Sequence, residues 1–193
     1  MRPSAVSRLL PLALLALAAS AGAQTPPAPA RMGPAECEVW ARELSFAQSV
    51  ADHDATAFAS HLETGAAFGA SQPQPTRGRE AIARRWAGII EGKRIRLSWY
   101  PTRTTMGSAD DVAWSSGPSL FEDLDPKATQ RFRIGTFHSV WHRGADGVWR
   151  VLFDDGVDPR PATEAEATAF PGGRRAPWPP APTAPTRKGV RVN

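Results

Sequence analysis

The spacing of apolar residues changes at Gly92, and this change limits the folds that the chain can adopt. Before Gly92, apolar side chains recur every three to four residues, as on one face of an α-helix. After it, they alternate with polar ones: Ile95, Leu97 and Trp99 are separated by arginine and serine, which is the period of a β-strand. Helices followed by strands predict an α+β domain, with helices packed on one side of an antiparallel sheet.

Three segments have helical periodicity. Residues 36–51 place most of their apolar side chains in one stripe, and Asp54 is suited to cap a short second helix. A third helix is expected between Gly78 and Gly92, because glycine commonly follows the last turn. A brief strand is expected at 66–70, before this third helix.

The second half of the chain predicts about four antiparallel strands, joined by turns. Alternation marks residues 94–99 and 112–114, and longer strands are expected at 131–143 and 148–154. The segment 144–147, Gly-Ala-Asp-Gly, supplies the residues that a hairpin turn between the last two strands requires.

The first 23 residues have the pattern of a secretory signal peptide. Arg2 and Arg8 precede the apolar run 9–19, and Ala-Gly-Ala at 21–23 is a small-residue cleavage site. The apolar run is shorter than the roughly 20 residues that cross a bilayer. We therefore expect an exported, periplasmic or extracellular protein with no transmembrane segment.

Proline and charge divide the rest of the chain. Residues 24–35 form a Pro-rich linker, residues 36–158 the predicted domain, and residues 159–193 a Pro- and Arg-rich tail that we expect to be disordered. The predicted domain carries 14 basic and 17 acidic side chains, a difference of −3, although the whole chain has a formal charge of +4. Since nucleic-acid-binding proteins place basic charge on the folded surface, no nucleic-acid partner is expected.

Four short strings occur in order along the predicted domain. They read Glu-x-x-Phe at 43–46, Arg-Gly-Arg-Glu-Ala-Ile at 77–82, Asp-Val-Ala-Trp-Ser-Ser-Gly at 111–117, and Val-Trp-His-Arg with Gly-Val-Trp-Arg-Val within 140–151. Together they resemble the SnoaL-like branch, of unknown function, in the nuclear transport factor 2-like superfamily. The resemblance implies three N-terminal helices on a curved antiparallel sheet, a cone-shaped, cystatin-like roll with an interior pocket. The branch usually has two acidic residues before its short strand, and here only Glu63 remains.

Glu43 falls near the middle of the apolar stripe of the first helix, so its carboxylate is predicted to face the interior. A buried charge must be hydrogen-bonded or neutralised. Two interpretations remain open. Glu43 is a structural residue satisfied by an arginine or by backbone amides, or it is a pocket carboxylate with a raised pKa that transfers protons.

His138 and Asp154 lie on the two strands that the last hairpin makes neighbours. If both point inward, they form an acid/base pair suited to moving protons beside a carbonyl. The alternative is a histidine on the sheet surface and an aspartate that closes the strand. Asp155 is an equally good candidate for the inward position.

Aromatic residues complete the candidate ligand pocket. Phe68, Trp86, Trp99 and Trp114 line an apolar cavity or pack the core. Trp149 is expected on the opposite sheet face, where relatives commonly pair two subunits, so a homodimer through the sheet face is the expected assembly.

The sequence lacks the residues that several kinds of chemistry require. The single cysteine, Cys37, excludes an internal disulfide and a cysteine-based zinc site, and the four histidines form no ligand cluster, so we expect no metal. A glycine-rich phosphate loop and a G-x-S-x-G nucleophile elbow are both missing. We expect no cofactor.

The sequence therefore favours an exported domain that binds a small organic molecule, apolar or of mixed polarity, without an assigned reaction. One alternative is a cofactor-free isomerase, dehydratase or hydrolase in which Glu43, His138 or Asp154 transfers a proton. The other is a dimeric protein-interaction module. Fold alone does not choose among them, because relatives include isomerases, dehydratases, epoxide hydrolases and non-enzymatic binding modules.

Overall fold

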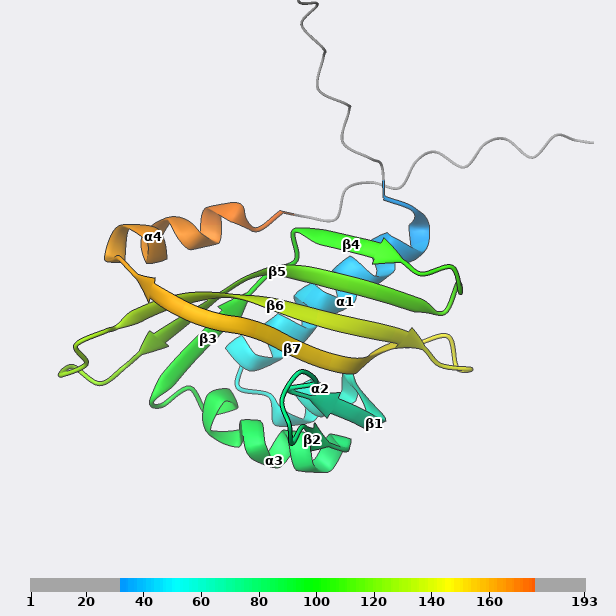
Figure 1. Ribbon diagram of the computed structural model, residues 1–193, viewed down its shortest axis with the longest axis horizontal. Helices are drawn as coiled ribbons and strands as arrows, with labels where there is room; N and C mark the ends of the chain where they lie inside the picture. Colours follow the sequence, from blue (N-terminus) through cyan, green and yellow to red (C-terminus); the bar gives the residue numbers. More distant parts are fainter. Residues whose placement is uncertain (1–31, 176–193) are drawn as a thin grey trace, which may run out of the picture. The chain divides into compact units, whose positions relative to one another are not determined.

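The computed structural model of the protein describes residues 32–175, in which three helices precede most of a seven-stranded sheet (Figure 1). This is the predicted α+β class. In chain order, the elements are α1 (Pro34–Ala51), α2 (Ala55–Ser60), β1 (Leu62–Phe68), β2 (Thr76–Arg77), α3 (Arg79–Ile90), β3 (Ile95–Trp99), β4 (Arg103–Met106), β5 (Val112–Asp123), β6 (Phe132–Arg143), β7 (Trp149–Ala162), α4 (Glu164–Ala169) and the 3₁₀ helix η1 (Phe170–Gly173).

The first two helices begin where the sequence supplies a cap. Pro34 starts α1, where its missing N–H costs no hydrogen bond, and the Glu36 carboxylate accepts from the Gly33 amide at 2.7 Å. The predicted cap of α2 is confirmed, since Asp54 Oδ1 accepts from the Ala57 amide at 2.8 Å.

The third helix lies between two glycines, as predicted. Gly78 and Gly92 have φ angles of 87° and 64°, a region that glycine occupies without strain. Ile82 and Ile90 of α3 are buried in the core. None of the helices in the described range is both long and apolar enough to cross a membrane.

The sheet has the strand order β2-β1-β7-β6-β5-β3, and β4 also pairs with β5. Every pairing is antiparallel except that of β1 with β7, which is parallel. The sequence predicted a brief strand at β1 but not its parallel pairing with β7, because a pairing between segments so far apart leaves no local pattern. The short strands β2 and β4 were also missed, since two and four residues are too few to show alternation.

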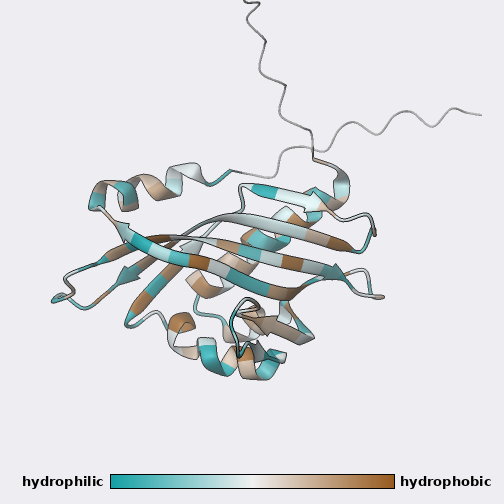
Figure 2. Ribbon diagram, in the orientation of Figure 1, coloured by the Kyte–Doolittle hydropathy of each residue, from teal (hydrophilic) through white to brown (hydrophobic). Residues whose placement is uncertain are grey.

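The three helices α1, α2 and α3 cover one face of the sheet, which we call the inner face; the other is the outer face. Along β6, Phe137, Ser139 and Trp141 are buried, whereas His138 and Val140 between them are half-buried. Figure 2 shows hydrophobic and hydrophilic residues alternating along β6 and β7. The core therefore lies between the inner face and the helices.

The ordered domain extends beyond the predicted boundary at residue 158. β7 continues to Ala162, and α4 and η1 follow. Phe170 is buried, with its ring centroid 4.9 Å from that of Tyr100, and Trp40 Nε1 donates to the Arg175 carbonyl oxygen at 3.3 Å. This burial of an aromatic ring orders residues that their proline and glycine content had marked as tail. Residues 1–31 and 176–193, which hold the predicted signal peptide, most of the linker and the end of the tail, lie outside the described residues.

Gly117 of β5 lies against the chain that joins β3 to β4. A Cβ added there would lie 2.0 Å from the Tyr100 carbonyl oxygen and 3.0 Å from the Thr102 nitrogen, and backbone atoms cannot move aside cheaply. We expect Gly117→Ala to lower the free energy of unfolding by about 2 kcal/mol, measured by urea denaturation. Gly88→Ala is the control, because an added Cβ in α3 meets no atom within 4 Å. Alanine favours a helix by about 1 kcal/mol, so an equal loss in both variants would contradict the packing described.

Candidate functional site

Glu43 of α1 lies against the inner face, and three side chains from the sheet hold its carboxyl group. The residue is 0% exposed. Trp99 Nε1 of β3 donates to Oε1 at 2.7 Å, and Trp141 Nε1 of β6 donates to Oε2 at 2.9 Å. The Ser115 hydroxyl of β5 also donates to Oε2. One carboxyl group therefore joins the first helix to three strands.

The interior orientation of Glu43 agrees with its place in the apolar stripe. Its partners differ from those expected, because two indoles and a hydroxyl take the place of an arginine or backbone amides. Burial raises the pKa of Glu43 above its ordinary value, and hydrogen bonds from Ser115, Trp99 and Trp141 partly offset that rise. The group is thus fully hydrogen-bonded but poorly solvated.

Aromatic rings pack the space around this carboxyl group. The ring of Phe46 lies 5.3 Å from that of Trp99 and 6.1 Å from that of Trp141, both edge to face. Trp86 of α3 adds a further edge contact to Trp99 at 6.4 Å. Such pairs stabilise a core beyond their apolar area alone. A ligand cannot touch Glu43 without displacing these rings, which favours its interpretation as a structural residue.

Asp154 of β7 is a second carboxyl group on the inner face, and it is only half-buried. Its Oδ2 accepts a hydrogen bond from the Ser139 hydroxyl of β6 at 2.8 Å. Burial raises the pKa of Asp154 well above its ordinary value, and the negative charges of Glu43 and Asp155 add to the rise. The Ser139 hydroxyl favours the ionised form of Asp154, and to a smaller extent that of Glu43.

A β-bulge determines which carboxyl group of β7 points inward. Adjacent residues of β6 pair with Val151 and Phe153, which leaves Leu152 as an extra residue on β7. Plain alternation from the buried Val151 would turn Asp155 inward. The extra residue shifts the alternation by one, so Asp154 takes the inward position instead.

His138 does not meet Asp154, and the acid/base pair considered for these two residues is not formed. The register pairs Ser139 with Asp154, and it pairs His138 with Asp155 on the outer face. There the His138 ring stacks on Trp114, with centroids 5.6 Å apart and an interplanar angle of 18°. Trp114 therefore also lies outside the interior.

The remaining predicted pocket residues stay on the inner side. Phe68 of β1 is the register partner of Asp154, and its ring lies 5.5 Å from that of the half-buried Trp86. Trp99 belongs to the packed core around Glu43. The sequence reasoning missed Ser115, Ser139 and Trp141, although a serine at an inward strand position among apolar residues is a usable signal of a buried polar partner.

Comparisons with known proteins find similarity in structure rather than in sequence. No family model matches the chain, and no curated protein does. A ketosteroid isomerase-like protein from Erwinia carotovora aligns with a TM-score of 0.53 at 12% identity, covering 66% of this chain and all of that one. An NTF2-like protein of unknown function from Pseudomonas putida gives 0.54 at 17% identity over 70% and 94%. An NTF2-like superfamily protein from Salmonella enterica gives 0.53 at 16% identity over 68% and 96%.

The chain has the nuclear transport factor 2-like fold. The likeness to these structures confirms the predicted cone of helices and curved sheet, and at such low identity it extends no further than the fold. Membership of the SnoaL-like branch stays a prediction.

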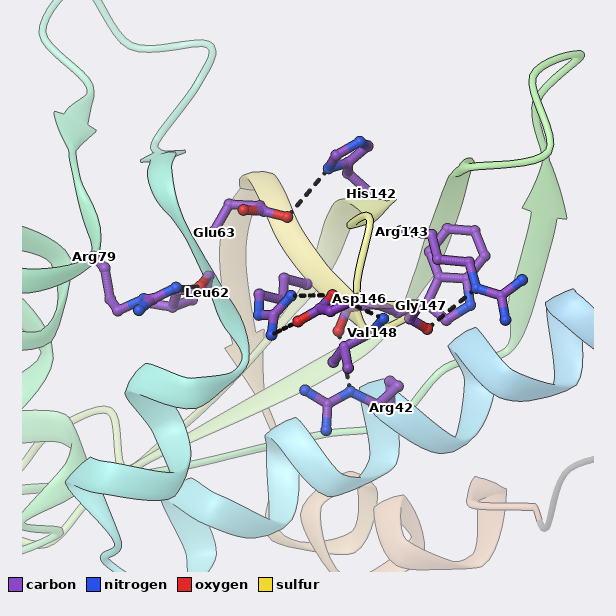
Figure 3. A network of polar contacts seen from close by, with 11 residues as sticks. Arg42, Leu62, Glu63, Arg79, His142, Arg143, Asp146, Gly147 and Val148 are labelled. Carbon is purple, nitrogen blue, oxygen red and sulfur yellow. Dashed lines mark hydrogen bonds and ion pairs between the residues drawn. The ribbon is translucent and has the colours of Figure 1, made fainter.

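The acidic residue that remains at the short strand of this nuclear transport factor 2-like domain has a partner. Glu63 Oε1 lies 3.1 Å from His142 Nδ1, beside the β6–β7 hairpin (Figure 3). In the same network Arg150 donates to Asp146 at 3.0 and 2.7 Å. Glu63 thus contributes to a surface network. Among residues 32–175, no group of three or more His, Cys, Asp or Glu side chains is placed to hold a metal ion.

Removing the Glu43 carboxyl leaves two indole N–H groups and a hydroxyl without their acceptor and opens a cavity. We expect Glu43→Ala to lower the free energy of unfolding by about 3–5 kcal/mol, measured by urea denaturation. Gln48→Ala, an exposed change on the same helix, should cost about 0.5 kcal/mol or less. Equal stability of the two variants would show that the Glu43 hydrogen bonds do not hold α1 to the sheet.

Asp154 gives the domain a pH-dependent stability. Because the folded state raises the pKa of Asp154, it retains the proton more tightly than the unfolded chain does, so stability falls as pH rises from about 4 through the raised pKa. Asp154→Asn removes this titration. We expect the variant to gain about 1 kcal/mol or more over the wild type between pH 4 and pH 8. Asp158→Asn, an exposed change on the same strand, is the control, and the same pH dependence of stability in both variants would contradict the assignment.

Proposed function

We propose that the domain binds a small organic molecule, apolar or of mixed polarity, at the inner face beside Asp154. The observation that carries this proposal is Asp154, a half-buried residue whose carboxyl group faces inward and accepts a hydrogen bond from Ser139. Ligand sites of proteins combine an apolar wall with a few fixed polar groups, and this corner of the domain has both.

The chemistry of the corner indicates the kind of ligand. A raised pKa keeps the Asp154 carboxyl protonated over a wider pH range, and a protonated carboxyl offers both a donor and an acceptor. Phe68 and the half-buried Trp86 supply aromatic surface on the same side. A compact apolar molecule with one carbonyl or hydroxyl group fits these contacts.

Binding without turnover is favoured over proton-transfer catalysis. Acid/base catalysis is best supported where titratable groups converge on the reacting atoms. Glu43 is enclosed by aromatic rings, and His138 stacks on the outer face. The fold shared with a ketosteroid isomerase-like protein supports a small-molecule site by analogy only. Proton transfer through Asp154 and Ser139 remains the alternative, and it would show as turnover that Asp154→Asn abolishes.

Native mass spectrometry of the purified protein with a panel of cyclic ketones and alcohols tests the binding proposal. We expect at least one complex with one ligand per chain, and a loss of affinity of about tenfold or more in Asp154→Asn. Asp158→Asn should bind as the wild type does. If Asp154→Asn leaves the affinity of the complex unchanged, the ligand binds elsewhere. The absence of any complex would count against this ligand class.

We also propose that the chain is exported, on the pattern of residues 1–23, and acts outside the cytoplasm. Fractionation of cells that produce the chain with and without these residues tests this. Equal distribution of the two forms would overturn export.

The outer face supports a second copy of the chain as a partner. Phe153 and Val157 of β7 are 42% and 60% exposed, on the same face as the Trp114–His138 stack. His138 Nδ1 is buried there without a hydrogen-bond partner among the described residues. We propose that two copies pair through this face, which would cover the apolar side chains and offer His138 an acceptor or donor.

Sedimentation equilibrium of outer-face variants checks the pairing. We expect the wild type to be a dimer, and Phe153→Glu and Val157→Glu to weaken dimerisation by about a hundredfold, because each buries a charge in an apolar interface. Val148→Glu changes an apolar side chain that is 37% exposed at the β6–β7 turn and should leave the dimer intact. A monomeric wild type, or equal loss in all three variants, would contradict pairing through the outer face.

A further inference from the structure

A groove of about 580 Å³ runs along the side of α1 that faces away from Glu43. At 100° per residue, its lining residues on α1 fall on the helix face opposite Glu43. The groove is open to solvent and is bordered by α2 and by the segment after η1. We call it the α1–α2 groove. It is lined by Arg42, Leu44, Ser45, Ala57, His61 and Arg174, among others.

Arg42 brings to the α1–α2 groove a positive charge that forms no ion pair within residues 32–175. Its Nε donates to the Trp149 carbonyl oxygen at 3.1 Å, which fixes the guanidinium group, and Figure 3 shows its terminal nitrogens turned away from the hairpin. The side chain is half-buried, and within residues 32–175 no carboxylate forms an ion pair with it. Burial, and then repulsion by Arg150, lowers the pKa of Arg42. A partly desolvated charge is stabilised by a counter-charge, which a bound anion would supply.

His61 and Ser45 form the polar wall of the groove. His61 Nδ1 lies 2.7 Å from the Ala57 carbonyl oxygen, which can only accept, so Nδ1 carries the hydrogen. Ser45 Oγ lies 2.8 Å from His61 Nε2 and 2.9 Å from the Arg42 carbonyl oxygen, so its one hydrogen is shared between these two acceptors when the ring is neutral. Burial and the nearby Arg42 lower the pKa of His61 to about 4, so the ring is neutral near pH 7. The positive charges of the groove therefore come from Arg42 and the exposed Arg174, and two carboxylates, Asp52 and Asp54, line the same groove.

We propose that the α1–α2 groove is a binding site for an organic anion, whose carboxylate lies between Arg42 and Arg174 and whose apolar body lies along Leu44 and Ala57. A guanidinium group matches a carboxylate with paired hydrogen bonds. The distance along α1 from Arg42 to Asp52 is about 15 Å, which sets the length of the ligand. Asp52 and Asp54, which also line the groove, disfavour a second negative charge, so the ligand is a monoanion.

Isothermal titration calorimetry of the full chain with dodecanoate, below its micelle concentration, tests the proposal. We expect one site per chain and a loss of affinity of about tenfold or more in Arg42→Gln and in Arg174→Gln. Arg174 is exposed, so its variant keeps the test valid if Arg42→Gln lowers stability. Arg84→Gln, which removes an equal charge from the exposed surface of α3, should leave the affinity unchanged.

Charge reversal of the probe is the second arm of the experiment. Dodecyltrimethylammonium has the same apolar chain with a cationic head and should not bind at the same concentration. Equal binding of the two probes, or affinity for dodecanoate that both Arg42→Gln and Arg174→Gln leave unchanged, would overturn the proposal. Asp154→Asn should not alter dodecanoate binding, which separates this groove from the proposed interior site.

Discussion

The hydrogen bonds between Glu43 and three strands are the constraint on which the rest of the structure depends. A fully buried carboxyl group is tolerated only when donors satisfy it, and Trp99, Ser115 and Trp141 each come from a different strand. These donors fix the position of α1 across the inner face. The aromatic rings can then pack closely between helix and sheet, because the polar atoms at their centre are paired.

This arrangement separates structural chemistry from chemistry that a ligand can reach. Glu43 is fully buried, whereas Asp154, whose carboxyl group accepts from Ser139, is a half-buried residue. The opposite side of the same helix carries the arginine of the α1–α2 groove. One helix thus contributes to the core on one face and to a candidate anion site on the other, which follows from the 3.6-residue period. The fold is shared with solved structures at 12–17% identity, so any function lies in these side chains.

Much of the fold was predictable because its signals are local. Helix boundaries at Asp54, Gly78 and Gly92 depend on caps and φ angles within a few residues, and strand alternation needs only the neighbouring positions. The extension of the ordered domain beyond residue 158 was not predictable from composition. It depends on the packing of Phe170 against Tyr100, a residue about seventy positions earlier. The parallel pairing of β1 with β7 depends on a similarly distant contact.

For the candidate site, the sequence by itself determined that Glu43 faces the interior, because the face of a helix on which a residue lies follows from its spacing alone. It did not determine the partners of Glu43, nor which of Asp154 and Asp155 points inward. The tertiary structure decided both, and for one physical reason. Strand register is set by pairing between distant segments, and a single extra residue, Leu152, turns the side chains of residues 153–157 of β7 to the opposite face.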